Sequence, residues 1–166
     1  MKVIILGDTH IPKRAKELPS QLIQELIVAN LIIHTGDWQS IEVYEQITKY
    51  GEVVGVYGNV DDDAIKERLP KKVVIELNGF KFGVIHGDGI GKTIEKRVIE
   101  AFKDEDVDCI IFGHSHIPVS KKVGNTWLFN PGSPTDKRKL SEFSYGVLTI
   151  DSGIILNHVY FKKSMK

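Results

Sequence analysis

The chain has 166 residues, of which 42% are hydrophobic and 27% charged, and these values predict a single globular domain over residues 1–166. Its 22 Lys and Arg balance its 22 Asp and Glu, so there is no strong nucleic-acid signal beyond the local cluster Lys137-Arg138-Lys139. The apolar runs are far shorter than the about 20 residues that span a membrane, and the first residues lack a signal peptide, so we expect a cytoplasmic protein.

Short strands alternate with helices in the first part of the chain. Strand patterns rich in Val and Ile occur at Val3–Leu6, Leu31–His34 and Val53–Tyr57. Between them, apolar residues recur at helical spacing over Leu22–Ile27 and Ile41–Ile47. This alternation is typical of strands that are linked by helices in an α/β fold.

Antiparallel hairpins are predicted in the later part of the chain. Asn78-Gly79 separates the strand patterns Val73–Leu77 and Lys81–Ile85, which is a strong hairpin signal. Gly124-Asn125 and Ser152-Gly153 mark the turns of two further strand pairs. A single parallel sheet would leave these hairpins unexplained. The sequence therefore favours two stacked mixed sheets with helices outside.

Between the hairpins, one more helix and one buried strand are predicted. Apolar residues four apart make a helical stripe of Ile90, Ile94, Val98 and Phe102. The run Asp108–Phe112 predicts a buried strand and contains Cys109, which we interpret as a buried structural thiol. Because it is the only cysteine, the chain has neither an intrachain disulfide nor a cysteine-based zinc site.

Polar motifs follow five of the predicted strands, where each strand passes into a loop. They are Gly7-Asp8-Thr9-His10, Gly36-Asp37, Gly58-Asn59-Val60-Asp61, His86-Gly87-Asp88 and Gly113-His114-Ser115-His116. In open α/β sheets, ligand sites gather in the loops beyond the carboxyl ends of the strands. We therefore expect these five loops to converge on one point.

Seven side chains of these loops have the chemistry of metal ligands: Asp8, His10, Asp37, Asn59, His86, His114 and His116. Oxygen and nitrogen ligands without sulfur suit Mn, Zn, Fe or Ni better than Mg or Ca. Seven ligands exceed the needs of one ion and fit two, each with a position open to water or substrate. Each motif alone is more often a turn, a cap or a structural histidine. Their occurrence together, in order, favours the metal site.

The remaining histidines and the tryptophans have simpler interpretations. His34 lies inside a strand and is interpreted as a core group or as a support behind the site. His158, near the C-terminus, is interpreted as a surface residue. Trp38 and Trp127 are interpreted as packing residues, and Trp38 is close enough to Asp37 in the sequence to wall the site.

At these motifs the sequence resembles the calcineurin-like metallophosphoesterase superfamily, within it the short one-domain phosphodiesterases that include the retromer subunit fold. The resemblance extends from Lys2 to about Asp151 and includes the turn Asn130-Pro131-Gly132-Ser133. It implies an α/β fold, a four-layer sandwich of two mixed β-sheets flanked by α-helices. It also implies a metal held by Asp8, His10, Asp37 and His116 and a second held by Asp37, Asn59, His86 and His114.

The resemblance further implies a metal-dependent phosphodiesterase or phosphatase that acts on a small phosphoester substrate. Two divalent transition metal ions, Mn first and Ni, Zn or Fe as alternatives, would activate a bridging hydroxide that attacks phosphorus. Asn59 would bind a metal and a phosphoryl oxygen. Many superfamily phosphatases have a proton-donating His where this chain has Val60, and Asp61 is the polar neighbour that remains. A non-catalytic interaction scaffold on the same fold is the alternative, and the sequence leaves a homo-oligomer open.

Overall fold

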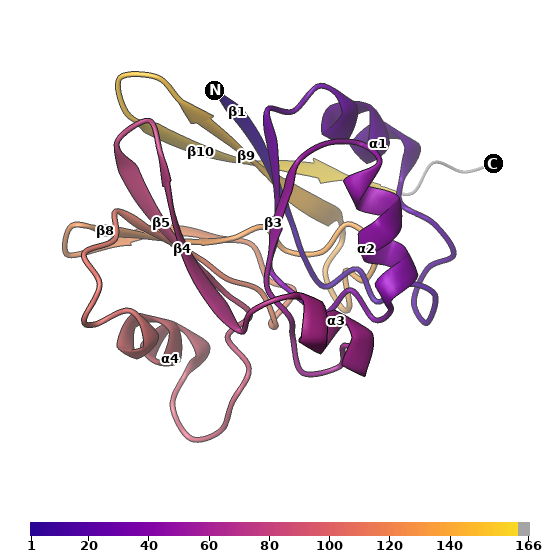
Figure 1. Ribbon diagram of the computed structural model, residues 1–166, viewed down its shortest axis with the longest axis horizontal. Coiled ribbons are helices and arrows are strands. Elements are labelled where there is room, and N and C mark those ends of the chain that lie inside the picture. Colours follow the sequence, from indigo (N-terminus) through magenta and orange to yellow (C-terminus); the bar gives the residue numbers. More distant parts are fainter. Residues whose placement is uncertain (163–166) are drawn as a thin grey trace.

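The computed structural model describes residues 1–162, which form ten strands and four helices (Figure 1). The strands are β1 Lys2–Leu6, β2 Leu31–His34, β3 Val53–Gly55, β4 Lys72–Leu77, β5 Phe80–Ile85, β6 Cys109–Ile111, β7 Val119–Val123, β8 Thr126–Asn130, β9 Phe143–Ile150 and β10 Ile154–Phe161. The helices are α1 Ser20–Ile27, α2 Ile41–Thr48, α3 Asp63–Arg68 and α4 Ile94–Ala101. Two five-stranded mixed sheets result, with the orders β10-β9-β1-β2-β3 and β4-β5-β6-β8-β7.

Alternating side chains along the strands divide the core into layers. In β1, Val3 and Ile5 pack into the cluster between the two sheets, whereas Ile4 and Leu6 pack with α1, α2 and α3. In β6, Ile110 packs with α4 on the other outer side. Figure 1 shows α1 to α3 together on one side of the sheets and α4 apart from them. The order helix, sheet, sheet, helix confirms the predicted four-layer sandwich.

Parallel pairing in each sheet brings the functional loops to one end of the sandwich. β1, β2 and β3 are parallel neighbours in the first sheet, and β5, β6 and β8 are parallel neighbours in the second. The loops after these strands are joined by backbone hydrogen bonds, from Asp8 N to Gly36 O at 2.9 Å and from Gly113 N to His86 O at 3.0 Å. Two further contacts, His114 N to Asp8 Oδ2 at 3.0 Å and His86 Nδ1 to Thr35 O at 2.8 Å, join the loops of one sheet to those of the other, so the carboxyl ends of these strands meet at one end of the sandwich.

The expected helix over residues 90–102 is wrong at its start. α4 begins at Ile94, and the side chain of Thr93 caps it by accepting a hydrogen bond from Lys96 N. Ile90 is 97% exposed and belongs to no apolar stripe. It lies between Gly89 and Gly91, whose φ angles of 148° and 92° are incompatible with a helix.

Two other features at the ends of strands refine the predictions. β3 ends at Gly55 and is shorter than the predicted run. His158, expected on the surface, is half-buried in β10: its ring stacks on Phe129 with centroids 4.5 Å apart.

Cys109 is fully buried as predicted, and burial raises the pKa of its thiol. Within the described residues, no helix is both long and apolar enough to cross a membrane.

Candidate metal centre

The five strand-end loops meet at one point and bring six of the seven candidate ligands together. The first group consists of Asp8, His10 and His116, and the second of Asp37, His86 and His114. Within each group, one potential ligand atom from every residue lies within 4.8 Å of the others. We call them the enclosed group and the open group, in that order. The seventh candidate, Asn59, is exposed, and within residues 1–162 its side chain makes no hydrogen bond.

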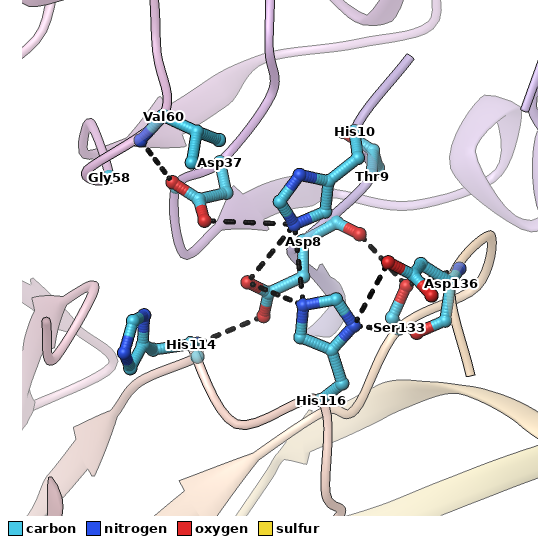
Figure 2. A network of polar contacts seen from close by, with 12 residues as sticks. Asp8, Thr9, His10, Asp37, Gly58, Val60, His114, His116, Ser133 and Asp136 are labelled. Atoms are coloured by element: carbon cyan, nitrogen blue, oxygen red, sulfur yellow. Dashed lines mark hydrogen bonds and ion pairs between the residues drawn. The ribbon is translucent and has the colours of Figure 1, made fainter. Parts of the chain in front are cut away.

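Asp37 faces both groups. Its Oδ2 atom is 3.1 Å from His86 Nε2 in its own group and 3.6 Å from His10 Nε2 in the enclosed group. Its Oδ1 atom accepts a hydrogen bond from the backbone N–H of Val60 at 3.1 Å (Figure 2). One oxygen is thus fixed by the backbone, and the other is available to both groups.

One carboxylate oxygen of Asp8, Oδ1, is buried in a position where a cation would compensate its charge. Its Oδ2 atom accepts the backbone N–H of His114 at 3.0 Å, but its buried Oδ1 atom has no hydrogen-bond partner in the described chain. Asp8 Oδ1 lies 3.5 Å from His116 Nε2 and 3.9 Å from the Nε2 atoms of His10 and His86. An unpaired carboxylate oxygen is costly to bury unless a cation compensates it. The donor set therefore fits a divalent ion.

Backbone carbonyl groups orient two of the imidazoles. His116 Nδ1 is 2.6 Å from Asp136 O, and His86 Nδ1 is 2.8 Å from Thr35 O. These carbonyl acceptors assign a proton to Nδ1 and leave Nε2 as the ring nitrogen that faces the carboxylates. Such contacts fix the tautomer and the ring orientation of metal-ligating histidines.

Five of the six ligand residues adopt a left-handed backbone conformation, with φ angles of 52° at Asp8, 46° at His10, 58° at Asp37, 72° at His114 and 62° at His116. Residues other than glycine pay roughly 1–3 kcal/mol for such conformations, which persist where the surrounding structure enforces them and gather at functional sites. Gly113 illustrates the crowding, because a Cβ atom there would lie 2.8 Å from Asp8 Oδ2. The backbone of these loops is therefore held in strained conformations that place the ligand side chains.

The charges of the two aspartates dominate the electrostatics of the open group. Burial disfavours the His86 imidazolium, but the hydrogen bond with Asp37 and the charges of Asp8 and Asp37 outweigh it and raise the pKa of His86 to about 9. Burial alone would raise the pKa of Asp37, yet its contacts with His86 hold it below the usual value. Burial and the charge of His86 lower the pKa of His114. Two buried carboxylates thus create a demand for positive charge at this point.

Asp61 lies behind Asp37. It is buried, and its carboxylate accepts backbone N–H groups from Asp37 at 3.0 Å, Gln39 at 2.8 Å and Gly58 at 2.7 Å. Burial raises the pKa of Asp61, whereas these hydrogen bonds oppose the rise. Both oxygens are engaged with the backbone, so the contacts of Asp61 hold two site loops together.

His34 and Trp38 support the loops from the core side. His34 Nδ1 accepts a hydrogen bond from Gly36 N at 3.1 Å, and its Nε2 is 3.2 Å from Thr9 Oγ1. Burial lowers the pKa of His34 well below its usual value, which keeps the ring neutral. Trp38 is fully buried and stacks on His34 with centroids 3.5 Å apart. It packs beneath the site and does not wall it.

Sequence reasoning missed the contribution of residues 133–138. Ser133 Oγ donates to Asp8 O at 2.8 Å across a separation of 125 residues, and Arg138 Nη2 is 3.2 Å from His116 Nε2. Figure 2 shows Ser133 and Asp136 next to Asp8 and His116. Two signals were available, the Asn130–Ser133 turn and the basic cluster, but neither indicates which loop it meets.

Comparisons with known proteins agree with this geometry. Residues 1–153 match the model of the calcineurin-like phosphoesterase superfamily domain. A probable metallophosphoesterase of Methanocaldococcus jannaschii is 38% identical over 141 residues, which are 83% of this chain and 70% of that protein. The structure of Entamoeba histolytica Vps29 in complex with zinc has a TM-score of 0.76 at 26% identity, covering 98% of this chain and 100% of that one. A structure described as a novel archaeal phosphodiesterase shares the fold, with a TM-score of 0.71, 22% identity, and coverage of 97% and 100%.

Proposed function

This chain belongs to the calcineurin-like phosphoesterase superfamily, and from that premise we propose that it is a phosphodiesterase dependent on two divalent transition metal ions. The observation that carries the proposal is the arrangement of six ligand residues in two groups with Asp37 facing both. The unpaired Asp8 Oδ1 at their centre supports it. A single ion would leave several of the imidazoles without a role.

The enclosed group would hold one ion and the open group the other, with Asp37 Oδ2 shared and Asn59 completing the open group. Mn is the metal we propose, with Ni, Zn or Fe as alternatives, because the ligands are oxygen and nitrogen atoms without sulfur. The zinc complex of the similar Vps29 chain supports a transition metal. When bound, the pair of ions supplies Lewis acidity to the phosphoryl group and lowers the pKa of water.

The Gly58–Asp61 loop sets the range of substrates. Asn59 is exposed in the loop whose Val60 N–H binds Asp37, and it would contact a phosphoryl oxygen of a small phosphoester. Val60 has no ionisable side chain, and the carboxylate of Asp61 is engaged by backbone N–H groups. No side chain of this loop is therefore placed to protonate a leaving group. Loss of a general acid costs about 10²–10⁴-fold, so phosphodiesters with acidic leaving groups are the expected substrates.

The alternative function is a non-catalytic interaction scaffold on the same fold. This alternative is supported by the structural similarity to Vps29, which covers 98% of this protein. Against it stands the complete set of Asp and His ligands, of which all but His114 are buried, since a scaffold has no need of an unpaired carboxylate oxygen in its interior.

The two functions are separated by one experiment on the full chain saturated with Mn. Metal analysis should find two ions per chain, and bis(p-nitrophenyl) phosphate should be hydrolysed. The variant His116→Gln should lose metal and activity, whereas the matched control His158→Gln, at a histidine outside both groups, should keep both. One ion or none, together with no hydrolysis of any ester, would contradict the proposed function and favour the scaffold.

A further inference from the structure

One cation reaches the metal centre itself. Arg138 Nη2 lies 3.2 Å from His116 Nε2, the ring nitrogen that also lies 3.5 Å from Asp8 Oδ1 and 3.3 Å from His10 Nε2. Because His116 Nδ1 carries the proton that it donates to Asp136 O, His116 Nε2 has a free lone pair, which accepts a hydrogen bond from the guanidinium of Arg138. The guanidinium thus lies at the nitrogen that would bind a metal ion.

The backbone places Arg138 at this edge. Arg138 has a left-handed φ of 49°, and its N–H donates to Asp136 Oδ1 at 3.4 Å. Asp136 N donates to Ser133 Oγ at 2.8 Å, and Ser133 Oγ donates in turn to the carbonyl oxygen of Asp8 at 2.8 Å (Figure 2). The loop that carries Arg138 is therefore hydrogen-bonded to the backbone of a proposed metal ligand.

Arg138 differs in its contacts from four other cations around the strand-end loops. These four have oxygen partners: Arg14 with Asp136 at 3.5 Å, Lys71 with Asp88 at 3.1 Å, Arg97 with Gly87 O at 3.0 Å and Lys137 with Leu140 O at 2.7 Å. The Arg138 guanidinium has no carboxylate within ion-pair distance in the part of the chain that the structure describes. Arg138 is exposed, and its positive charge is free to attract an anion.

A contact between a guanidinium and an imidazole lone pair competes directly with a metal ion. When His116 Nε2 binds a metal, the guanidinium loses that acceptor and needs an anion instead. A guanidinium presents N–H groups in a planar fork that matches two oxygens of a phosphoryl group. It stays protonated at all physiological pH values, so it supplies charge and not the missing proton.

We propose that Arg138 binds the non-bridging oxygens of the substrate's phosphoryl group at the His116 edge of the centre. The inference rests on the proposed function, since it takes phosphoester hydrolysis as the reaction of this site. Coulomb attraction grows with the charge of the bound group. Arg138 therefore favours dianionic phosphomonoesters more than monoanionic phosphodiesters, and its presence widens the substrate range.

The test uses inorganic phosphate as the probe and the Mn-saturated full chain as the protein. Isothermal titration calorimetry should show that Arg138→Gln weakens phosphate binding about ten- to a hundredfold, as expected for a lost charge-assisted hydrogen bond. Lys139→Gln removes the same charge one residue away, at an exposed side chain, and should weaken binding by less than about fivefold. Arg138→Lys, which keeps the charge without the fork, should bind with intermediate affinity.

Metal analysis of the same samples separates anion binding from a structural role. Arg138→Gln should keep the metal content of the parent chain, and its kcat/KM should fall further for p-nitrophenyl phosphate than for bis(p-nitrophenyl) phosphate. Equal phosphate affinities of the Arg138→Gln and Lys139→Gln variants would overturn the inference, and so would a loss of metal that parallels the loss of phosphate binding. A parent chain that binds phosphate through Arg138 but hydrolyses neither ester would refute the proposed function and leave phosphate binding established.

Discussion

The enclosed group and the open group differ in access to solvent. All three side chains of the enclosed group are buried, and the most exposed of them, His10, is 7% exposed. In the open group, Asp37 and His86 are buried, but His114 is half-buried, and the neighbouring Asn59 is exposed. We therefore expect the enclosed group to retain its proposed ion more firmly and the open group to exchange its proposed ion and water more readily.

The supports of the two groups differ as well. The enclosed group is supported by the loop between β8 and β9, because Ser133 and Asp136 contact Asp8 and His116. The open group is supported by the loop after β3, because Asp61 fixes the backbone at Asp37. Variants can therefore address each group, or both through the one residue that they share.

Replacement of Asp37, the residue that faces both groups, should weaken metal binding at the enclosed group and at the open group alike. Asp37→Ala removes the oxygen that faces both groups, so metal content should fall below one ion per chain. Activity should fall by more than the about 10–100-fold that follows the loss of a partner outside the ligand set. Metal analysis and hydrolysis of bis(p-nitrophenyl) phosphate measure both effects. Asp104→Ala, at an exposed aspartate, is the control, and retention of two ions by Asp37→Ala would disprove sharing.

Chemistry on the open side should depend on the missing proton donor at Val60. The parent chain should show a steep dependence of rate on leaving-group pKa, with nitrophenyl diesters cleaved readily and alkyl esters hardly at all. Val60→His should flatten this dependence and accelerate alkyl esters by up to about 10²-fold. Val60→Asn is the polar control without an acid, and it keeps the backbone N–H that binds Asp37. A shallow dependence in the parent chain would show that another group donates the proton.

The two groups should release their ions at different rates when metal is removed. A chelator should take the ion of the open group first, and His114→Gln should abolish that step alone. An ion at a hundredfold excess over its Kd stabilises the folded state by about 2.7 kcal/mol. Its loss should lower the Tm by about 5–10 °C for a chain of this size. Release in one step would contradict the comparison, and complete unfolding would show that the metals are structural.

The convergence of the strand-end loops was predictable because strands and their polar ends are local signals. His86 directly follows an apolar run, Asp8 and Asp37 lie two and four residues after the last apolar residue of theirs, and parallel pairing brings those ends together. The apolar spacing that suggested a helical turn at Ile90 is overridden by its two glycine neighbours. Spacing alone does not weigh that conformational preference.

Contacts between distant segments were beyond the reach of sequence patterns. Arg138 meets His116, and Ser133 meets Asp8, only because β8 and β9 belong to different sheets and the loop between them crosses the end of the sandwich. His158 is half-buried for a related reason, since β10 in the first sheet places its ring on Phe129 of the second.

The smallest expected effect concerns His158, which lies outside both groups but beneath a loop that serves both. Its Nε2 is 2.7 Å from Asn130 O, and Asn130 Nδ2 donates to Gly113 O at 3.0 Å, next to the loop of His114 and His116. Burial lowers the pKa of His158 below 6.5, and the hydrogen bond to Asn130 only partly opposes this. The unfolded chain therefore takes up the proton first as the pH falls.

The sign of the pH effect follows from that order of protonation. Stability that His158 contributes at neutral pH is lost as the pH falls below about 6.5 toward its folded-state pKa. His158→Gln carries no such proton, so its Tm should fall less than that of the parent chain between pH 7 and pH 5. Thermal unfolding of both metal-free chains measures the difference, in which the shared histidines of the two groups cancel. Parallel Tm curves would show that burial at His158 leaves its pKa unchanged, and both proteins should still bind two ions at pH 7.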